Sequence, residues 1–303
     1  MCMNMLATVK CPCCGKEMKA TNIDKISAKK YDDCIRKCET CEIGASNASE
    51  NPTIIYKDYH QNIPQSLQLQ TYLDETLKNA LNKRNRNNKR IRIGYSTSED
   101  ALSWIFINYF VQNKNLEELK NILGIKDNIE DILMWGVSQI KKDDSTKNKI
   151  ENICKNLSEN THSYSEPDII IITKKEVCFI EVKLKSSNEK ASKKDFEKYL
   201  IDEYYTDKEK AKSTLYYELI RNWTIGNCLA KQDKDSKTMR LINLAPQKSF
   251  KKENESLNRF KDSLKTQNFY MLSWEDVFKK MKNSEFKDIL LNRINSIVRL
   301  NFK

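Results

Sequence analysis

Glycine, proline and histidine are scarce in this chain, and long apolar runs are missing. Only 6 Gly and 5 Pro occur among 303 residues, which argues against extended low-complexity linkers. No run approaches the roughly 18 apolar residues of a membrane span, and the start, Met1-Cys-Met-Asn-Met-Leu, lacks the apolar segment of a signal peptide. The two histidines, His60 and His162, are expected to be structural or exposed, so a histidine-based triad is poorly supported. We therefore expect an intracellular, cytoplasmic protein.

Basic residues are in excess. The chain has 53 Lys and Arg against 42 Asp and Glu, a formal charge of +11, which favours polyanions through phosphate neutralisation and counterion release. A membrane surface is also anionic, but we find no lipidation motif and no polybasic segment beside a long apolar helix. The 39% apolar content supports a real core, and the length allows one large domain with a small appendage. The composition favours a nucleic-acid partner.

Cysteines are concentrated near the start. Of the ten in the chain, four form two C-x-x-C pairs separated by 23 residues: Cys11 with Cys14, and Cys38 with Cys41. In an intracellular protein such pairs indicate thiols or metal ligands rather than disulfides, and two of them complete a tetrahedral zinc site. Four thiolates leave no open position for water, so the zinc would be structural, within a module of residues 1–50. Cys13 and Cys34 could replace one of the four ligands, and reduced, unliganded cysteine is the alternative.

A basic segment follows within a predicted connector, residues 51–94. A helix is plausible from Tyr72 to Ala80. Beyond it, six cations occur within ten residues without an acid: Lys83, Arg84, Arg86, Lys89, Arg90 and Arg92. They fit a phosphate-contacting arm, in which each neutralised phosphate would steepen the log–log salt slope by about 0.9. A solvated, partly mobile connection is the alternative.

A capped helix is predicted next. Ser96-Thr-Ser-Glu99 has the pattern of a capping box. Apolar residues then recur at helical spacing at Leu102, Ile105, Phe106, Tyr109 and Phe110. Glu99 would either complete the cap or supply a carboxylate to a metal site.

The most informative segment is a predicted hairpin. Asp168 opens an apolar run, the polar connection Thr173-Lys-Lys-Glu176 turns the chain, and a second run ends in Glu181-Val-Lys183. Side chains alternate faces along a strand, so Glu181 and Lys183 point the same way. Two carboxylates and an amine would converge there, able to hold a divalent metal and manage the proton of an attacking water. A solvated charge pair is the alternative.

Other segments complete an α/β pattern. Residues 115–160 are predicted as further helix and polar loop, with an apolar helical face within 116–123 and a short helix at Ile129–Val137. Helices are also predicted for the charged stretch Lys190–Lys212 (a solvated helix or flap) and for Leu215–Gly226. Strands are predicted for Thr238–Pro246 and Phe269–Leu272, and Ser273 is expected to cap a last helix. Within the 215–226 helix, Glu218 and Arg221 either pair with each other or flank the active site, with Arg221 reaching phosphate. The predicted fold is α/β with a mixed sheet.

With Glu99, Asp168, Glu181-Val-Lys183 and the later helix in this order, the chain resembles the PD-(D/E)XK nuclease superfamily. Ser98-Glu-Asp-Ala-Leu-Ser-Trp104 and Tyr216-Tyr-Glu-Leu-Ile-Arg-Asn-Trp-Thr-Ile-Gly226 are similar to motifs of a restriction endonuclease family within it. The resemblance covers residues 95 to 280, and the nuclease domain is expected to span 95–303. It implies a restriction-endonuclease-like core, with a mixed β-sheet flanked by helices, that catalyses Mg²⁺-dependent phosphodiester hydrolysis.

The resemblance also implies roles for single residues. Asp168 and Glu181 would bind Mg²⁺, Lys183 would orient or activate the water, and Glu99 would be the acidic residue of the first helix. Glu218 stands where many relatives carry Gln, which leaves its role between metal support and substrate contact.

The expected function is a DNA endonuclease of restriction type that cuts double-stranded DNA. A non-catalytic, zinc-stabilised DNA-binding protein and a nuclease for RNA or repair intermediates are the alternatives. A homodimer would suit cutting of both strands.

Overall fold

The chain folds into two compact units. The structure, a computed structural model, describes residues 6–21, 27–48, 52–186, 188, 191, 195–232 and 236–301. One unit comprises the described residues of Met1–Leu73 and Arg86–Ile105, and the other those of Asp74–Asn85 and Phe106–Lys303. The predicted connector, 51–94, is therefore divided between the two units.

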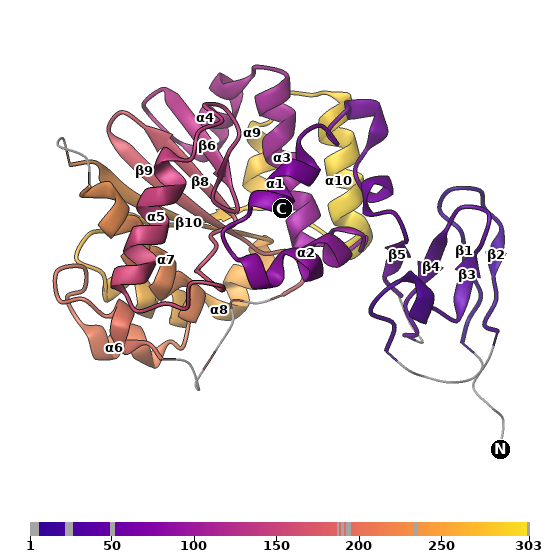
Figure 1. Ribbon diagram of the computed structural model, residues 1–303, viewed down its shortest axis with the longest axis horizontal. Coiled ribbons are helices and arrows are strands. Elements are labelled where there is room, and N and C mark those ends of the chain that lie inside the picture. Colours follow the sequence, from indigo (N-terminus) through magenta and orange to yellow (C-terminus); the bar gives the residue numbers. More distant parts are fainter. Residues whose placement is uncertain are drawn as a thin grey trace. The chain divides into compact units, whose positions relative to one another are not determined.

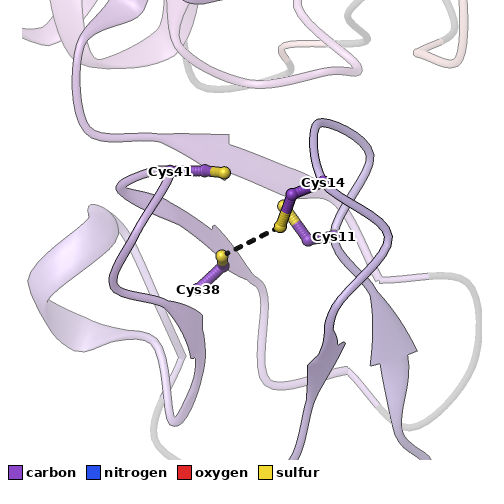
Figure 2. A group of neighbouring side chains, drawn as sticks. All are labelled: Cys11, Cys14, Cys38 and Cys41. Carbon is purple, nitrogen blue, oxygen red and sulfur yellow. Dashed lines mark hydrogen bonds between the residues drawn. The ribbon is translucent and has the colours of Figure 1, made fainter.

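The first unit contains two small antiparallel sheets around the cysteine pairs. Strands β1 (Val9–Lys10) and β2 (Glu17–Met18) form a hairpin, and β3 (Arg36–Cys38), β4 (Ile43–Ala45) and β5 (Ile54–Tyr56) form a three-stranded sheet. One pair lies in the β1–β2 turn and the other in the β3–β4 turn, and the four side chains converge (Figure 2). Gly15 closes the first turn at φ +73°, a conformation that favours glycine. The module extends past residue 50, because β5 pairs with β4.

The rest of the first unit includes the 3-10 turns Tyr59–Asn62 and Gln65–Leu67, helix α2 (Arg86–Ile93) and the start of helix α3 (Glu99–Gln112). The capping box predicted from Ser96 is wrong in register. Ser98 Oγ accepts from the Ala101 amide at 3.1 Å, whereas Ser96 Oγ accepts from the Ile54 amide at 3.1 Å. Because the Ser96 hydroxyl is bonded to β5, Ser98 caps the helix instead, and Glu99 is the first helical residue.

The second unit is built on a six-stranded mixed sheet in the order β11-β10-β9-β8-β6-β7. Its strands are β6 (Ile129–Met134), β7 (Val137–Ser138), β8 (Ile169–Thr173), β9 (Glu176–Val182), β10 (Thr238–Ala245) and β11 (Phe269–Ser273). Strands β9, β10 and β11 are parallel to one another, and β8 is antiparallel to both of its neighbours, β6 and β9. The predicted 168–183 hairpin, the two later strands and the mixed α/β architecture are thus confirmed.

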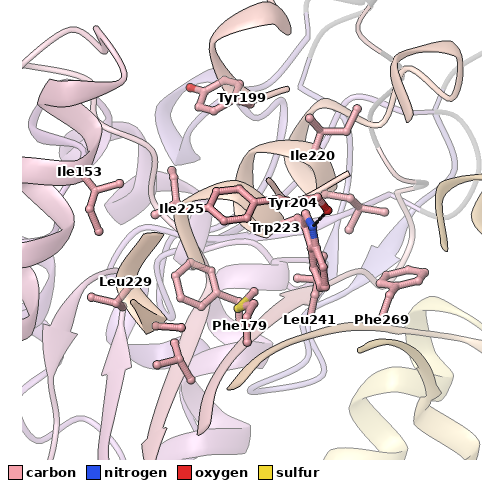
Figure 3. Close-up of a cluster of buried hydrophobic side chains, with 14 of the residues drawn as sticks. Ile153, Phe179, Tyr199, Tyr204, Ile220, Trp223, Ile225, Leu229, Leu241 and Phe269 are labelled. Carbon is pink, nitrogen blue, oxygen red and sulfur yellow. Dashed lines mark hydrogen bonds between the residues drawn. The ribbon is translucent and has the colours of Figure 1, made fainter. Parts of the chain in front are cut away.

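Helices cover both faces of this sheet. In Figure 1, α5 (Ser145–Asn156) and α7 (Tyr217–Ala230) lie on one face, and α9 (Trp274–Lys280) and the part of α3 from Phe106 onward lie on the other. The remaining helices are α1 (Leu73–Asn79), α4 (Leu116–Leu123), α6 (Lys208–Ser213), α8 (Gln247–Asp262) and α10 (Glu285–Ile297), with short 3-10 turns at Lys83–Asn85 and Glu197–Tyr199. The core under α7 includes Phe179, Trp223 and Leu241, and the Trp223 indole donates to the Tyr204 carbonyl at 3.1 Å (Figure 3).

Two predicted helices are wrong. Ile129–Val137 forms β6 and β7, joined by Trp135 and Gly136 at φ +50° and +83°, the left-handed pair of a tight hairpin. Since β6 is buried for most of its length, its short apolar run had no periodicity that separates strand from helix.

Most of the charged stretch is not a solvated helix, because residues 195–207 form a 3-10 turn at Glu197–Tyr199 and irregular structure, and a helix, α6, begins only at Lys208. The first part of the stretch faces the core against α7, where the buried residues are Phe196, Tyr199, Leu200 and Tyr204. Residues 190 and 192–194 lie outside the described residues. None of the helices in the described part of the chain combines the length and apolar character needed to cross a membrane.

Candidate active site and metal centre

The hairpin and its neighbouring strand hold the predicted acid–acid–lysine set in the second unit. Asp168 precedes β8, and its carboxylate accepts a hydrogen bond from the Val182 amide at 2.9 Å. The Lys183 amide donates to the Leu244 carbonyl at 2.7 Å, and the Lys183 carbonyl accepts from the Trp274 indole at 3.2 Å. Both backbone groups of Lys183 are therefore fixed, one by β10 and the other by α9.

Lys183 bridges two carboxylates. Its Nζ lies 2.8 Å from Glu181 Oε1 and 2.6 Å from Glu218 Oε2. The side chains of Lys183 and Glu181 are only 9% and 5% exposed, while that of Glu218 is 24% exposed. Glu218 reaches the site because α7 packs on β9 and β10. Of the two sequence-based alternatives, the structure pairs Glu218 with Lys183 and not with Arg221.

Asn222 is a site residue that the sequence analysis missed. Its Nδ2 donates to Glu181 Oε2 at 2.8 Å, and its Oδ1 accepts from Arg221 Nε and Nη2, both at 3.3 Å. Asn222 is fully buried, so these bonds fix the orientation of the Glu181 carboxylate and the Arg221 guanidinium together. Its position in the sequence could have indicated this role, because Asn222 follows Glu218 by four residues and therefore lies on the same face of the helix.

The charges of this cluster are strongly coupled. Burial raises the pKa of Glu181 against the opposing attraction of Lys183. Burial also disfavours the Lys183 ammonium, but Glu181, Glu218 and Asp168 together raise the pKa of Lys183 well above its ordinary value. For Glu218, attraction to Lys183 and Arg221 outweighs burial and lowers the pKa. Lys183 is therefore a charged donor at neutral pH rather than a proton acceptor.

Glu99 belongs to the first unit, whereas Asp168, Glu181 and Lys183 belong to the second. Its predicted place beside the site stays a prediction.

The cysteine pairs form a candidate metal centre. The Sγ atoms of Cys11, Cys14, Cys38 and Cys41 all lie within 4.8 Å of one another, and those of Cys14 and Cys38 are 3.6 Å apart (Figure 2). Tetrahedral zinc with bonds of about 2.3 Å places its sulfurs about 3.8 Å apart, so the cluster could hold such an ion. The Lys16 amide lowers the pKa of Cys14 to about 7, whereas the pKa values of Cys38 and Cys41 are raised, that of Cys41 chiefly by its hydrogen bond to Cys14. Cys14 therefore ionises more readily than Cys38 and Cys41.

The structure also decides between the cysteine alternatives. Cys13 is exposed, and Cys34 is buried beside Tyr31 and Ile55 in a separate cluster; neither belongs to the four-cysteine group.

The basic segment is helical and divided. Lys83 and Arg84 belong to the second unit, and the other four cations lie on α2 in the first. Lys89 does not fit its predicted role, because its Nζ pairs with Asp100 at 2.8 Å and its side chain is 6% exposed. Asp100 lies in the next helix, so the sequence of the basic segment alone does not predict this ion pair. Lys83, Arg84 and Arg92 are exposed, and Arg86 and Arg90 are half-buried.

Comparison of the chain with protein-family models, with curated proteins and with solved structures found no match.

Proposed function

We propose that the second unit is a Mg²⁺-dependent DNA endonuclease of restriction type. The observation that carries the proposal is the Lys183 ammonium held between Glu181 and Glu218, with the Asp168 carboxylate beside the same strand end. The order α3, β6, β8, β9, α7, β10, with β10 parallel to β9, supports the restriction-endonuclease-like core that the sequence resemblance implies.

The donor set fits Mg²⁺. Asp168 and Glu181 offer carboxylate oxygens, the ligands that this hard cation prefers. Glu181 accepts bonds from Lys183 and Asn222, but each carboxylate oxygen has a second lone pair. The local carboxylates Asp168, Glu181 and Glu218 also outnumber the local cations Lys183 and Arg221, so a divalent cation would balance buried negative charge. When bound, Mg²⁺ would polarise the scissile phosphate and lower the pKa of the attacking water.

The protein's own residues have separable roles in this proposal. Lys183, kept protonated by its carboxylates, stabilises negative charge that grows on the phosphate. Asn222 holds the Glu181 carboxylate in its binding orientation, and Glu218 holds Lys183. Arg221, whose guanidinium lies 5.8 Å from the centre of the Tyr217 ring, contacts a neighbouring phosphate.

The proposal is tested by incubating the purified protein with plasmid, single-stranded DNA and RNA, in Mg²⁺ or EDTA. We expect Mg²⁺-dependent cleavage of duplex DNA that is abolished in Asp168→Ala, Glu181→Ala and Lys183→Ala while DNA binding is kept. Lys174→Ala, at the exposed far turn of the same hairpin, is the matched control and should cleave normally.

Each alternative has its own result. Full cleavage by Glu181→Ala would refute the site. Cleavage of RNA alone would favour the RNA nuclease, and DNA binding without cleavage of any substrate would favour the non-catalytic DNA-binding protein. A two-fold dimer, proposed for cutting both strands, is checked by light scattering with and without DNA.

The cysteine-bearing part of the first unit, from β1 to β5, is proposed as a structural zinc module. So small a core gains most of its folding free energy from the metal, on the order of 10 kcal/mol. The exposed cations Lys83, Arg84 and Arg92 remain candidates for phosphate contact.

A further inference from the structure

A cavity of about 480 Å³ opens in the second unit, outside the residues assigned to catalysis. It lies between helix α8, strand β11 and the start of α9, and its volume is within the range of small-ligand sites. Its wall includes Gln247, Phe250, Lys251, Asn254, Met271 and Asp276.

The cavity lies on the same face of the sheet as the catalytic set. Glu181, Asn243 and Met271 are in register on the adjacent parallel strands β9, β10 and β11, so their side chains point to the same side. With a spacing of about 4.8 Å per strand, Met271 lies about 10 Å from Glu181 across the sheet.

Two buried connections tie the cavity to the catalytic strand. The Trp274 indole donates to the Lys183 carbonyl, and Trp274 directly follows Ser273, which also lines the cavity. From the other side, Asn243 Nδ2 donates to Asn188 Oδ1, and Asn188 Nδ2 donates to Glu253 Oε2 of α8, both at 2.9 Å. These bonds join the walls of the cavity, α8 and α9, to the strands that carry the catalytic set, so the distance between the cavity and the catalytic set is fixed.

Ser273 and Asp276 line one end of the cavity, where the Ser273 hydroxyl donates to the Asp276 carboxylate at 2.6 Å, and the rest of the lining combines three kinds of group. Phe250 and Met271 form an apolar wall that packs on the core under α7. Gln247 and Asn254 carry amides that both donate and accept, the groups that read base edges. Lys251 is exposed on α8, and its ammonium has no ion-pair partner within the described part of the chain. The apolar wall with its aromatic ring suits the face of a nucleobase, the two amides suit its edge, and the Lys251 ammonium suits the attached phosphate.

We propose that this cavity binds a nucleobase of the DNA strand being cut, with Lys251 on the adjoining phosphate. The inference rests on the proposed nuclease function and deepens it by placing a specificity contact. At about 3.4 Å of rise per nucleotide, a separation of about 10 Å places the bound base about three nucleotides from the scissile phosphate.

One arm of the test uses DNA. On a duplex that the full-length protein cleaves, Lys251→Ala and Asn254→Ala are expected to lower kcat/KM at least tenfold. Lys252→Ala, an equally exposed charge on the next residue of α8, should stay within twofold. An abasic nucleotide is then moved along each strand. When the abasic nucleotide lies about three nucleotides from the cut, it should lower the cleavage rate of the wild type as much as either substitution does. At that position it should not lower the cleavage rate of the Lys251→Ala and Asn254→Ala proteins any further.

The second arm measures binding of dAMP, dGMP, dCMP and TMP to the same proteins by calorimetry, which separates a base of DNA from a free nucleotide. Normal cleavage by Lys251→Ala and Asn254→Ala, with no abasic position that matters, would overturn the inference and leave the proposed nuclease intact. Mononucleotide binding that depends on Lys251 and Asn254, in a protein that cleaves no nucleic acid, would overturn both the nuclease and the DNA assignment of the cavity.

Discussion

Replacing Lys183 with methionine tests the charge arrangement of the site without any assumption about its reaction. The substitution keeps most of the side-chain volume but removes the ammonium that bridges Glu181 and Glu218. Glu218 retains some access to water, whereas Glu181 is left buried, with Asn222 still donating to its carboxylate but without the ammonium that balanced its charge. Removing one partner of a buried ion pair costs about 3–5 kcal/mol because the other charge is stranded.

The loss of unfolding free energy in Lys183→Met should depend on pH, and the titration of Glu181 determines whether the loss grows or shrinks as pH rises. Burial already holds the pKa of Glu181 above its ordinary value, and loss of Lys183 removes the attraction that opposes this rise. A carboxyl with a raised folded-state pKa binds more protons folded than unfolded, so stability falls as pH rises from the unfolded value through the folded one. A tenfold change in the acid constant of the folded protein corresponds to about 1.4 kcal/mol. The variant should therefore lose more stability at pH 8 than at pH 5.5.

The Lys183 charge of the wild type does not change over this range. The pKa of Lys183 is raised in the folded protein, so its contribution is complete below the ordinary lysine value and is lost only as pH rises through the folded one.

The assay is urea unfolding followed by tryptophan fluorescence at pH 5.5 and pH 8. Adding Glu181→Gln to the variant should remove the extra loss at pH 8, and Lys174→Met, at the exposed hairpin turn, should change stability by less than about 0.5 kcal/mol. A cost of Lys183→Met below about 1 kcal/mol, or one equal at both pH values, would refute the buried, charged bridge.

Three further predictions concern the metals and the basic helix. Cys38→Ser should lose bound zinc and become sensitive to protease, whereas Cys13→Ser, outside the cluster, should keep one zinc by elemental analysis. Mg²⁺ at about 100 times its Kd should stabilise the wild type by about 2.7 kcal/mol in urea unfolding, and Glu181→Ala should show no such gain. Lys89→Ala should lose about 3 kcal/mol of stability because it strands the largely buried Asp100. Exposed Arg92→Ala should instead leave stability unchanged and reduce the salt slope of DNA binding by about 0.9.

Local patterns were sufficient where neighbouring residues carry the chemistry. The C-x-x-C spacing predicted the four cysteines that converge, since a short turn brings both thiols of a pair to the same side. Alternation along a strand predicted that Glu181 and Lys183 share a face, and the polar turn at 173–176 predicted the hairpin beside Asp168.

The same local patterns misled where burial comes from distant parts of the chain. Ile129–Met134 is a strand because β8 pairs with it, and Phe196 and Tyr199 are core residues because α7 covers them. Such contacts join segments tens of residues apart, so the apolar pattern within one or two helical turns of sequence does not predict them.

The sequence by itself therefore determined that the four cysteines converge and that Asp168, Glu181 and Lys183 lie together at the end of a hairpin, because both arrangements depend on short-range geometry. Only the tertiary structure decided that Glu218 bridges to Lys183, that Asn222 orients Glu181, and that Lys89 is paired with Asp100. Each of these contacts joins side chains from different elements, and the packing of those elements against one another sets which charges meet and which stay in water.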